Sequence, residues 1–375
     1  MSTPTSFMDH FSELPDPRVE RTKLYSLIDI LAITLCAVIA GAEGWSDIAQ
    51  YGRSKQAWLE TFLELPNGIP TDDTFSRVLS RLDPEAFSRC FAAWTQSIKK
   101  KTQGRVVCID GKSLRHSFDT ATGKAAIVMV SAWANDSRLV LAQQKVDAKS
   151  NEITAIPSLL EMLDLQGCIV TLDAMGTQKQ VAHQIVAQQA DYVLALKGNQ
   201  GHAHEEVAHF FETGLRKGFG DVTVYTHETA DYDHGRIEKR RYSQVDQIDW
   251  LLAKDDWSGL ASIGMMQTER TLNGVTSQET RYYLSSLPAG VGRFANAVRA
   301  HWGIENSLHW RLDICFAEDS SRIRRDRAPQ NMATIRHIAL NLLQNEKTLK
   351  RGIKARRLQA AWDDNYLATV LTGQN

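Results

Sequence analysis

The segment RVVCIDGKS, residues 105–113, places four apolar residues in a row before the acid Asp110. Such a run predicts a short buried β-strand that stops at the Asp-Gly pair. A phosphate-binding loop would need a glycine five residues before Gly111, where the chain has Val106, so this interpretation fails. An ordinary strand-to-turn transition and a metal ligand at the edge of a sheet both remain open.

The segment CIVTLDAMGTQ, residues 168–178, repeats the arrangement, because the apolar run 169–172 is followed by Asp173. The carboxyl ends of strands in a sheet covered by helices are the places where ligand-binding groups collect. Two carboxylates at neighbouring strand ends would repel each other unless a cation lay between them. The pair therefore predicts a divalent metal ion.

A third acid, Glu305, lies in a segment whose apolar residues repeat at helical spacing, namely Phe294, Val298, Leu308 and Leu312. Glu305 and His301 fall within the same stripe, so we expect Glu305 to face the core. A buried carboxylate costs several kcal/mol unless it is paired or coordinated. The alternative to metal binding is an ion pair with Arg299 or Arg311. Zinc is disfavoured, because there is no HExxH pattern and no nearby cysteine pair.

Composition indicates a globular protein of two or three domains, with 375 residues, 43 basic and 44 acidic side chains and 43% hydrophobic residues. The longest apolar run, residues 30–42, is shorter than the roughly 20 residues of a membrane span, so it predicts a core helix and no membrane partner. The five cysteines are odd in number and contain no CxxC pair. This usage predicts a reducing, cytoplasmic location.

Positive charge is concentrated near the C-terminus. Residues 322–357 contain eleven lysines and arginines against two acids. The chain as a whole is nearly neutral, so this segment is the part that favours a nucleic-acid partner.

The first hundred residues predict helices. Thr71 suits an N-cap, and the apolar residues that follow it recur at i, i+3, i+4 and i+7, namely Phe75, Val78, Leu79 and Leu82. Asp83 and Pro84 then end this helix and begin another. The pair is compatible with a DNA-reading helix-turn-helix or with a plain bundle.

From Arg105 onward the pattern changes to short runs rich in Val, Ile and Leu. Three strands in succession, followed by helix, strand, helix and strand, predict a mixed sheet covered by helices. Residues 201–288 interrupt this order with alternating segments that indicate a β-rich insertion.

The motifs CIDGKSLR, TLDAMGTQ, ALKGNQ and HWGIENSLHWRLDICFAED, followed by SRIRRDRAPQNMATIRHIALNLL, resemble the DDE transposases of bacterial insertion sequences. The resemblance is to the ISAs-type group, which includes the H-repeat-associated proteins of RHS elements, and it covers nearly the whole chain. It implies an α/β, RNase H-like mixed sheet with flanking helices. It also implies a helical N-terminal DNA-binding domain at 1–103, a catalytic domain at 104–345 with an insertion at about 201–290, and a basic tail at 346–375.

By this resemblance the catalytic, metal-binding triad is Asp110, Asp173 and Glu305. The ions would be two Mg²⁺ or Mn²⁺, with Asp110 bridging them. The partner would be double-stranded DNA, comprising element ends and target, bound by a homodimer. The reaction would be hydrolysis at the element end followed by attack of the freed 3′-hydroxyl on target DNA. A catalytically inactive remnant and a host nuclease remain alternatives.

One departure from related transposases concerns the Tyr-x2-Arg-x3-Glu-x6-Lys signature around the third acid. This chain has Val298, His301 and Leu312 where that signature has Tyr, Arg and Lys. The phosphate contacts around Glu305 therefore stay unassigned. The candidates for DNA contacts are Lys112, Lys197, Asn199, Arg299, His301, Arg311, Arg322, Arg324, Arg325 and Arg327.

Overall fold

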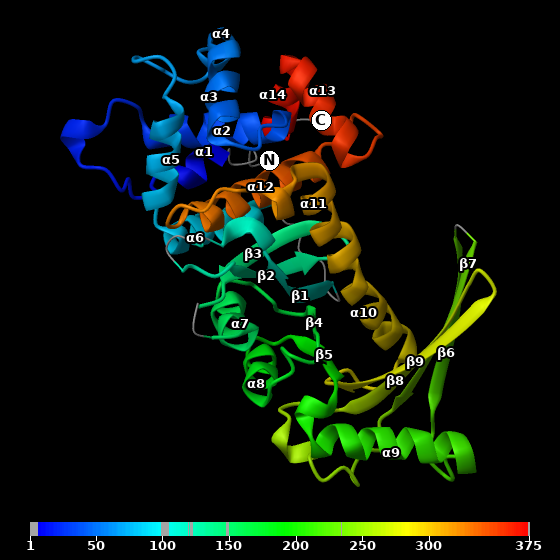
Figure 1. The fold of residues 1–375 in the computed structure, drawn as a ribbon. Helices are drawn as coiled ribbons and strands as arrows, with labels where there is room; N and C mark the ends of the chain where they lie inside the picture. Colours follow the sequence, from blue (N-terminus) through cyan, green and yellow to red (C-terminus); the bar gives the residue numbers. More distant parts are fainter. Residues whose placement is uncertain are drawn as a thin grey trace.

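The computed structural model describes residues 7–98, 105–118, 120, 123–147, 150–233 and 235–373. The boundary predicted between residues 103 and 104 lies outside the described residues. The described strands form one sheet in the order β3-β2-β1-β4-β5-β9-β8-β7-β6 (Figure 1). The strands are β1 (Val106–Ser113), β2 (Val128–Ala134), β3 (Leu139–Lys145), β4 (Ile169–Leu172), β5 (Asp191–Leu196), β6 (Tyr225–Asp233), β7 (Arg236–Val245), β8 (Ser262–Leu272) and β9 (Val275–Ser285).

The first five strands form the RNase H-like part of the sheet. β1 pairs antiparallel with β2, and β2 pairs antiparallel with β3. β1 pairs parallel with β4, and β4 pairs parallel with β5. Helices α7 (Glu152–Glu161) and α8 (Lys179–Ala187) make the crossovers that parallel strands require. The predicted mixed α/β fold is confirmed.

The segment predicted as an insertion continues this sheet. After α9 (His202–Lys217) the chain forms four antiparallel strands, and β9 returns to pair with β5, with Val193 opposite Ser285. The strands β6 to β9 therefore extend the central sheet and do not form a separate one. Figure 1 shows their far ends projecting beyond the helices.

The remaining helices gather at the other end of the molecule or lie along the sheet (Figure 1). They are α1 (Phe7–Phe11), α2 (Leu27–Ala40), α3 (Trp45–Ser54), α4 (Gln56–Leu59), α5 (Asp72–Arg81), α6 (Pro84–Ile98), α10 (Val291–Ile304), the π-helical turn η5 (Glu305–His309), α11 (Trp310–Phe316), α12 (Ala328–Asn345), α13 (Ile353–Trp362) and α14 (Asp364–Thr372).

Helix α2 confirms the predicted core helix, because its residues from Ile30 to Ile39 are all buried. Among the described residues, no single helix is both long and apolar enough to cross a membrane. In the described part of the chain, α2 and α3 taken together reach that length and apolarity, and they meet at a 97° bend.

Helix α12 is the centre of the core. Every residue from Ala328 to Gln344 is buried. Its polar side chains fix its neighbours, because Asn331 donates to the Leu79 carbonyl of α5 and Asn341 bonds both backbone groups of Val140 on β3. One apolar cluster therefore includes both the N-terminal helices and the sheet.

The predicted helix pair at 71–98 is present as α5 and α6, and Phe75, Val78 and Leu79 are fully buried. Helix α6 packs on β3, α12 and α1. This packing favours the bundle interpretation of the pair.

Residues 346–373 form α13 and α14 instead of an extended basic tail. Two of the basic residues are engaged with helix ends. Arg357 is buried and donates to the carbonyls of Val38 and Ile39, and Arg356 donates to the carbonyls of Leu343 and Glu346. The last carbonyls of a helix lack intrahelical donors, and a cation there also opposes the helix dipole.

Candidate active site

Asp110 and Asp173 lie where two parallel strands separate. The parallel pairing of β1 with β4 ends at Ile109 and Leu172, and each acid is the next residue in the chain. β1 does not end at Asp110, as the sequence suggested, because pairing with β2 continues as far as Ser113. Asp110 is therefore paired with a neighbouring strand on one side only, and its mostly buried side chain lines a cleft.

The three acids predicted as a triad line one cleft of about 300 Å³. Glu305 reaches it from the π-helical turn η5, in which the Trp310 N–H donates to the Glu305 carbonyl. The expectation that Glu305 faces the core is wrong. Ile304 and Leu308 fill the core here, and Glu305 is exposed. Glu305 still lies on the same side of the helix as Val298 and His301, because all three line the cleft, but at Glu305 this side opens to solvent.

The electrostatics of this cleft are set by crowded negative charge. Burial, together with the negative charges of Asp173, Glu305 and Glu152, raises the pKa of Asp110 to about 7. One Asp173 oxygen accepts a hydrogen bond from the Gly176 N–H at 2.9 Å. Among the described residues, the charged side chains that act on Asp110 are all acids. A cation bound at this place would relieve their mutual repulsion.

The donor set fits Mg²⁺ or Mn²⁺, because carboxylate oxygens are the ligands that these hard ions prefer. Among the described residues, no three His, Cys, Asp or Glu side chains already converge at metal-binding distance. The three acids share a cleft and repel one another, and an ion would draw them together.

Two histidines border the acids. His301 Nδ1 lies 2.9 Å from the Thr171 hydroxyl on β4, and His309 Nδ1 lies 3.6 Å from Asp110 Oδ2. Burial lowers the pKa of each histidine to about 4. Both imidazoles are therefore neutral at pH 7, and the contact of His309 with Asp110 is not an ion pair.

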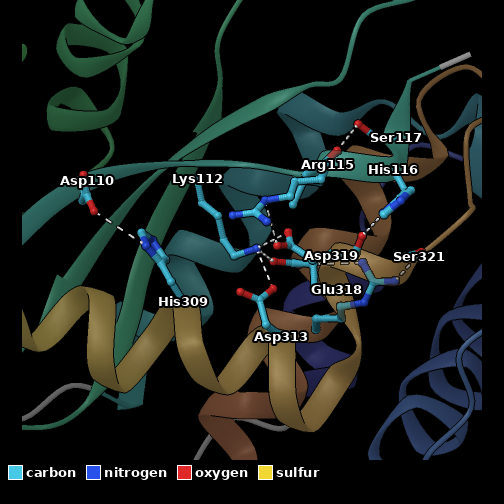
Figure 2. Close-up of polar contacts among 12 residues, drawn as sticks. Asp110, Lys112, Arg115, His116, Ser117, His309, Asp313, Glu318, Asp319 and Ser321 are labelled. Atoms are coloured by element: carbon cyan, nitrogen blue, oxygen red, sulfur yellow. Dashed lines mark hydrogen bonds and ion pairs between the residues drawn. The ribbon is translucent and has the colours of Figure 1, made fainter.

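Lys112, a predicted DNA contact, has carboxylate partners. Its ammonium lies 2.7 Å from Asp313 Oδ1, 2.8 Å from Asp319 Oδ1 and 3.5 Å from Glu318 Oε2, as Figure 2 shows. Its side chain is only 10% exposed. Burial alone would lower the pKa of Lys112, but the three acids outweigh burial and raise it.

The other predicted contacts near the cleft divide into two groups. Lys197 is exposed and lines the cleft together with His301. Asn199 donates its amide to the Ala174 carbonyl, and Arg299 is paired with Asp231 at 3.1 Å. Arg311 is half-buried and is not among the described residues that line the cleft.

The four predicted arginines after η5 lie in a loop near α5, because the Arg327 N–H donates to the Ser80 carbonyl. Arg322, Arg325 and Arg327 are exposed. Arg324 is half-buried, donates to the His116 carbonyl at 2.9 Å and stacks over Phe118.

Sequence reasoning missed three residues of the cleft region. Arg281 of β9 stacks over Trp302 at 4.4 Å, and both line the cleft. The carboxyl group of Glu152, the first residue of α7, lies against Gly111 next to Asp110. An acid directly after an N-cap asparagine is a common helix start, so no sequence signal set Glu152 apart.

Comparison with known proteins agrees with this geometry. The family described as "DDE_Tnp_1-associated" matches residues 8–95, and the family described as "Transposase DDE domain" matches residues 101–342. The protein named "H repeat-associated putative transposase YhhI" from Escherichia coli K12 is 41% identical over 98% of this chain and 97% of its own length. "Putative transposase YncI" from Escherichia coli O157:H7 is 42% identical over 98% of this chain and 94% of its own.

A solved structure of a piggyBac transposase synaptic complex with hairpin DNA aligns with a TM-score of 0.43 at 10% identity, covering 97% of this chain and 76% of that one. That likeness is too distant to add to the assignment. The match of the DDE domain to most of the chain, together with the full-length relatives, shows that this protein belongs to the DDE transposase family.

Proposed function

We propose that this protein cuts DNA at the ends of an insertion sequence and joins the freed ends to target DNA. The observation that carries the proposal is the placement of Asp110, Asp173 and Glu305 around one cleft. Asp110 and Asp173 lie 195 and 132 residues before Glu305 in the chain, and the fold brings the three together from strand β1, the end of β4 and a π-helical turn.

In this proposal Asp110, Asp173 and Glu305 hold the metal ions. Bound Mg²⁺ or Mn²⁺ would supply charge neutralisation for the attacking and leaving oxygens of a phosphodiester. Asp110, whose charged form is disfavoured by burial and by three neighbouring acids, would gain the most from a bound cation. The Gly176 N–H holds one oxygen of Asp173, which fixes the direction of that carboxylate.

The residues at the rim of the cleft would position DNA. Lys197 and Arg281 offer positive charge to phosphate oxygens, and Trp302 holds the Arg281 guanidinium in place. The exposed Arg322, Arg325 and Arg327 would extend phosphate binding away from the cleft.

The test is a joining assay. The protein is incubated with labelled duplexes carrying the ends of the element that encodes it, a target plasmid and Mg²⁺. Joined products in the wild type, absent from Asp110→Asn, support the proposal. Cleavage without joining would make the protein a nuclease, and binding without cleavage would make it an inactive remnant.

Assembly as a homodimer on DNA and a cytoplasmic location belong to the same proposal. The five cysteines are free thiols, which suits a reducing compartment. Light scattering of the protein with and without an element-end duplex tests the dimer, because a mass that stays that of one copy per duplex contradicts it.

A further inference from the structure

One face of β1 meets the helix that carries Glu305 at successive points, because alternate residues of a strand point to the same side. The contacts are Cys108 Sγ to the Ala300 carbonyl at 3.2 Å, Asp110 Oδ2 to His309 Nδ1 at 3.6 Å, and Lys112 Nζ to Asp313 Oδ1 at 2.7 Å. Figure 2 shows the last two contacts side by side. Glu305 lies between the first and second contact points on the helix.

Between the Asp110–His309 and Lys112–Asp313 contacts, the distance along the strand is close to the distance along the helix. Two residues along a strand cover roughly 6.6 Å. Four residues along a helix, as from His309 to Asp313, cover about 6 Å. The match depends on the π-helical turn at 305–309, because one extra residue in a helix rotates all that follows by about 100°.

The three contacts differ in strength. A thiol is a weak donor, and 3.6 Å between Asp110 and His309 is longer than a hydrogen bond. The Lys112–Asp313 contact is short, charged and mostly withdrawn from water, which makes it the strongest of the three. It is therefore the contact that fixes the register of the helix against the strand.

We propose that Lys112 is a positioning residue that acts through Asp313 to hold the π-helical turn, and with it the Glu305 carboxylate, at the cleft. This inference rests on the proposed function, because it assigns Glu305 to the metal site. Lys112 would touch neither metal nor DNA.

The competing explanation is that Lys112 is simply a counter-ion for three acids. The structure offers a matched pair of variants that separates the two explanations. Asp313 and Asp319 contact the same ammonium at 2.7 and 2.8 Å, but Asp313 is on the helix that follows Glu305, whereas Asp319 is on a separate turn after that helix has ended. Asp313→Asn and Asp319→Asn each remove one charge from the same lysine, and Asp319→Asn also removes the partner of the exposed Arg115.

The experiment uses the full-length chain and two measurements. The first is hydrogen exchange of the backbone amides of residues 305–313 in metal-free protein. The second is the Mn²⁺ dissociation constant, from titration of the free Mn²⁺ signal by electron paramagnetic resonance. Residues that orient metal ligands change metal affinity by about 10- to 100-fold. We expect Asp313→Asn to speed exchange and to weaken Mn²⁺ binding by about tenfold, and Asp319→Asn to change neither.

Two further variants complete the design. Asp313→Glu keeps the carboxylate and is expected to restore both measurements, which separates the effect from misfolding of Asp313→Asn. In a Glu305→Gln background, Asp313→Asn should weaken Mn²⁺ binding no further, because it acts through Glu305.

Equal effects of Asp313→Asn and Asp319→Asn would overturn the positioning role, as would unchanged exchange in Asp313→Asn. A wild type that does not bind Mn²⁺ would overturn the proposed function instead. The exchange difference between the two variants would then decide the positioning role by itself.

Discussion

The carboxyl group of Glu152 occupies the space beside the Cα of Gly111, where an ideal Cβ would lie 2.3 Å from its carboxyl carbon. Glycine at position 111 therefore lets a fourth acid approach Asp110. Burial and, to a smaller extent, the negative charge of Asp173 raise the pKa of Glu152. This carboxylate therefore also belongs to the crowded cluster.

Gly111→Ala should push the Glu152 carboxylate away. We expect Gly111→Ala to lower the unfolding free energy by about 1 kcal/mol when Glu152 is present. In a Glu152→Ala background the same substitution should raise it slightly, because alanine lowers the entropy of the unfolded chain. Urea unfolding of the four proteins measures the coupling. Gly198→Ala, whose Cβ would meet no described atom within 4 Å, is the control, and additive effects of the Gly111 and Glu152 changes would contradict the prediction.

Stability in acid should depend on His337. Its ring is 3% exposed and stacks near Phe91, and burial lowers its pKa to about 3. The unfolded chain binds a proton near pH 6.5 while the folded chain does not, so stability is complete above pH 6.5 and falls as the pH drops toward 3. His337→Leu should remove about 2 kcal/mol of this loss at pH 4.5.

Thermal melts from pH 7 to pH 4.5 test this prediction. The exposed His202, whose side chain is 97% accessible, provides the control variant His202→Leu. An acid dependence that is the same in His337→Leu as in wild type would count against it. His301 and His309 should leave part of the dependence in place, because burial lowers their pKa values too.

The exposed arginines of the loop before α12 should contact DNA phosphates. Reversal of the exposed Arg325 and Arg327 to Glu should weaken binding to all duplexes and lower the slope of log affinity against log salt by about 2, because each phosphate contact contributes about 0.9. Arg216→Glu with Lys217→Glu, at the exposed end of α9, reverses the same charge elsewhere. Similar slopes in both double variants would mean that the loop makes no specific phosphate contacts.

Arg357 should contribute to folding instead. Its buried guanidinium donates to Val38 and Ile39 and lies 4.3 Å above the Phe316 ring. Arg357→Met removes the arginine donor from the Ile39 carbonyl and leaves the Val38 carbonyl with the Gly41 N–H at 3.3 Å, which should cost about 2 kcal/mol of unfolding free energy. Arg351→Met, at an exposed position, is the control in the same denaturant titration. A loss no larger than that of the control would show that this arginine is dispensable.

The sequence located Asp110 and Asp173 because strands buried on both faces are continuous apolar runs, and such runs are visible without knowledge of their neighbours. The exposure of Glu305 was not predictable, since helical spacing cannot show that the side of the helix buried at Val298 opens into the cleft at Glu305. The partners of Lys112 are 201 and 207 residues away, and no local pattern links them. The sequence predicted that the C-terminal basic residues bind nucleic acid. It could not show that Arg356 and Arg357 bind helix ends, because tertiary packing places those helix ends beside them.

The triad makes the sharpest prediction. Asp110→Asn, Asp173→Asn and Glu305→Gln nearly preserve shape, so each should abolish cleavage and joining while folding and DNA binding persist. Asp110→Asn should raise the melting temperature of metal-free protein, because burial and three neighbouring acids raise the pKa of Asp110 to about 7 and so disfavour its charged form. The folded pKa lies above the unfolded value, so the destabilisation is complete above pH 7 and fades as the pH falls toward 4. The gain should therefore be greater at pH 8 than at pH 5, by about 2 kcal/mol.

Metal should reverse the order of stability between the wild type and Asp110→Asn. Added Mg²⁺ or Mn²⁺ should stabilise the wild type more than any of the three variants, because a ligand stabilises the folded state more when it binds that state more tightly. If Asp110 were only a turn residue and Glu305 only a partner for an arginine, each substitution would destabilise metal-free protein and metal would act on all four proteins alike. Thermal melts of the four proteins over a metal titration distinguish these patterns without natural DNA ends, and strand cleavage that persists in Asp110→Asn would remove Asp110 from the catalytic site.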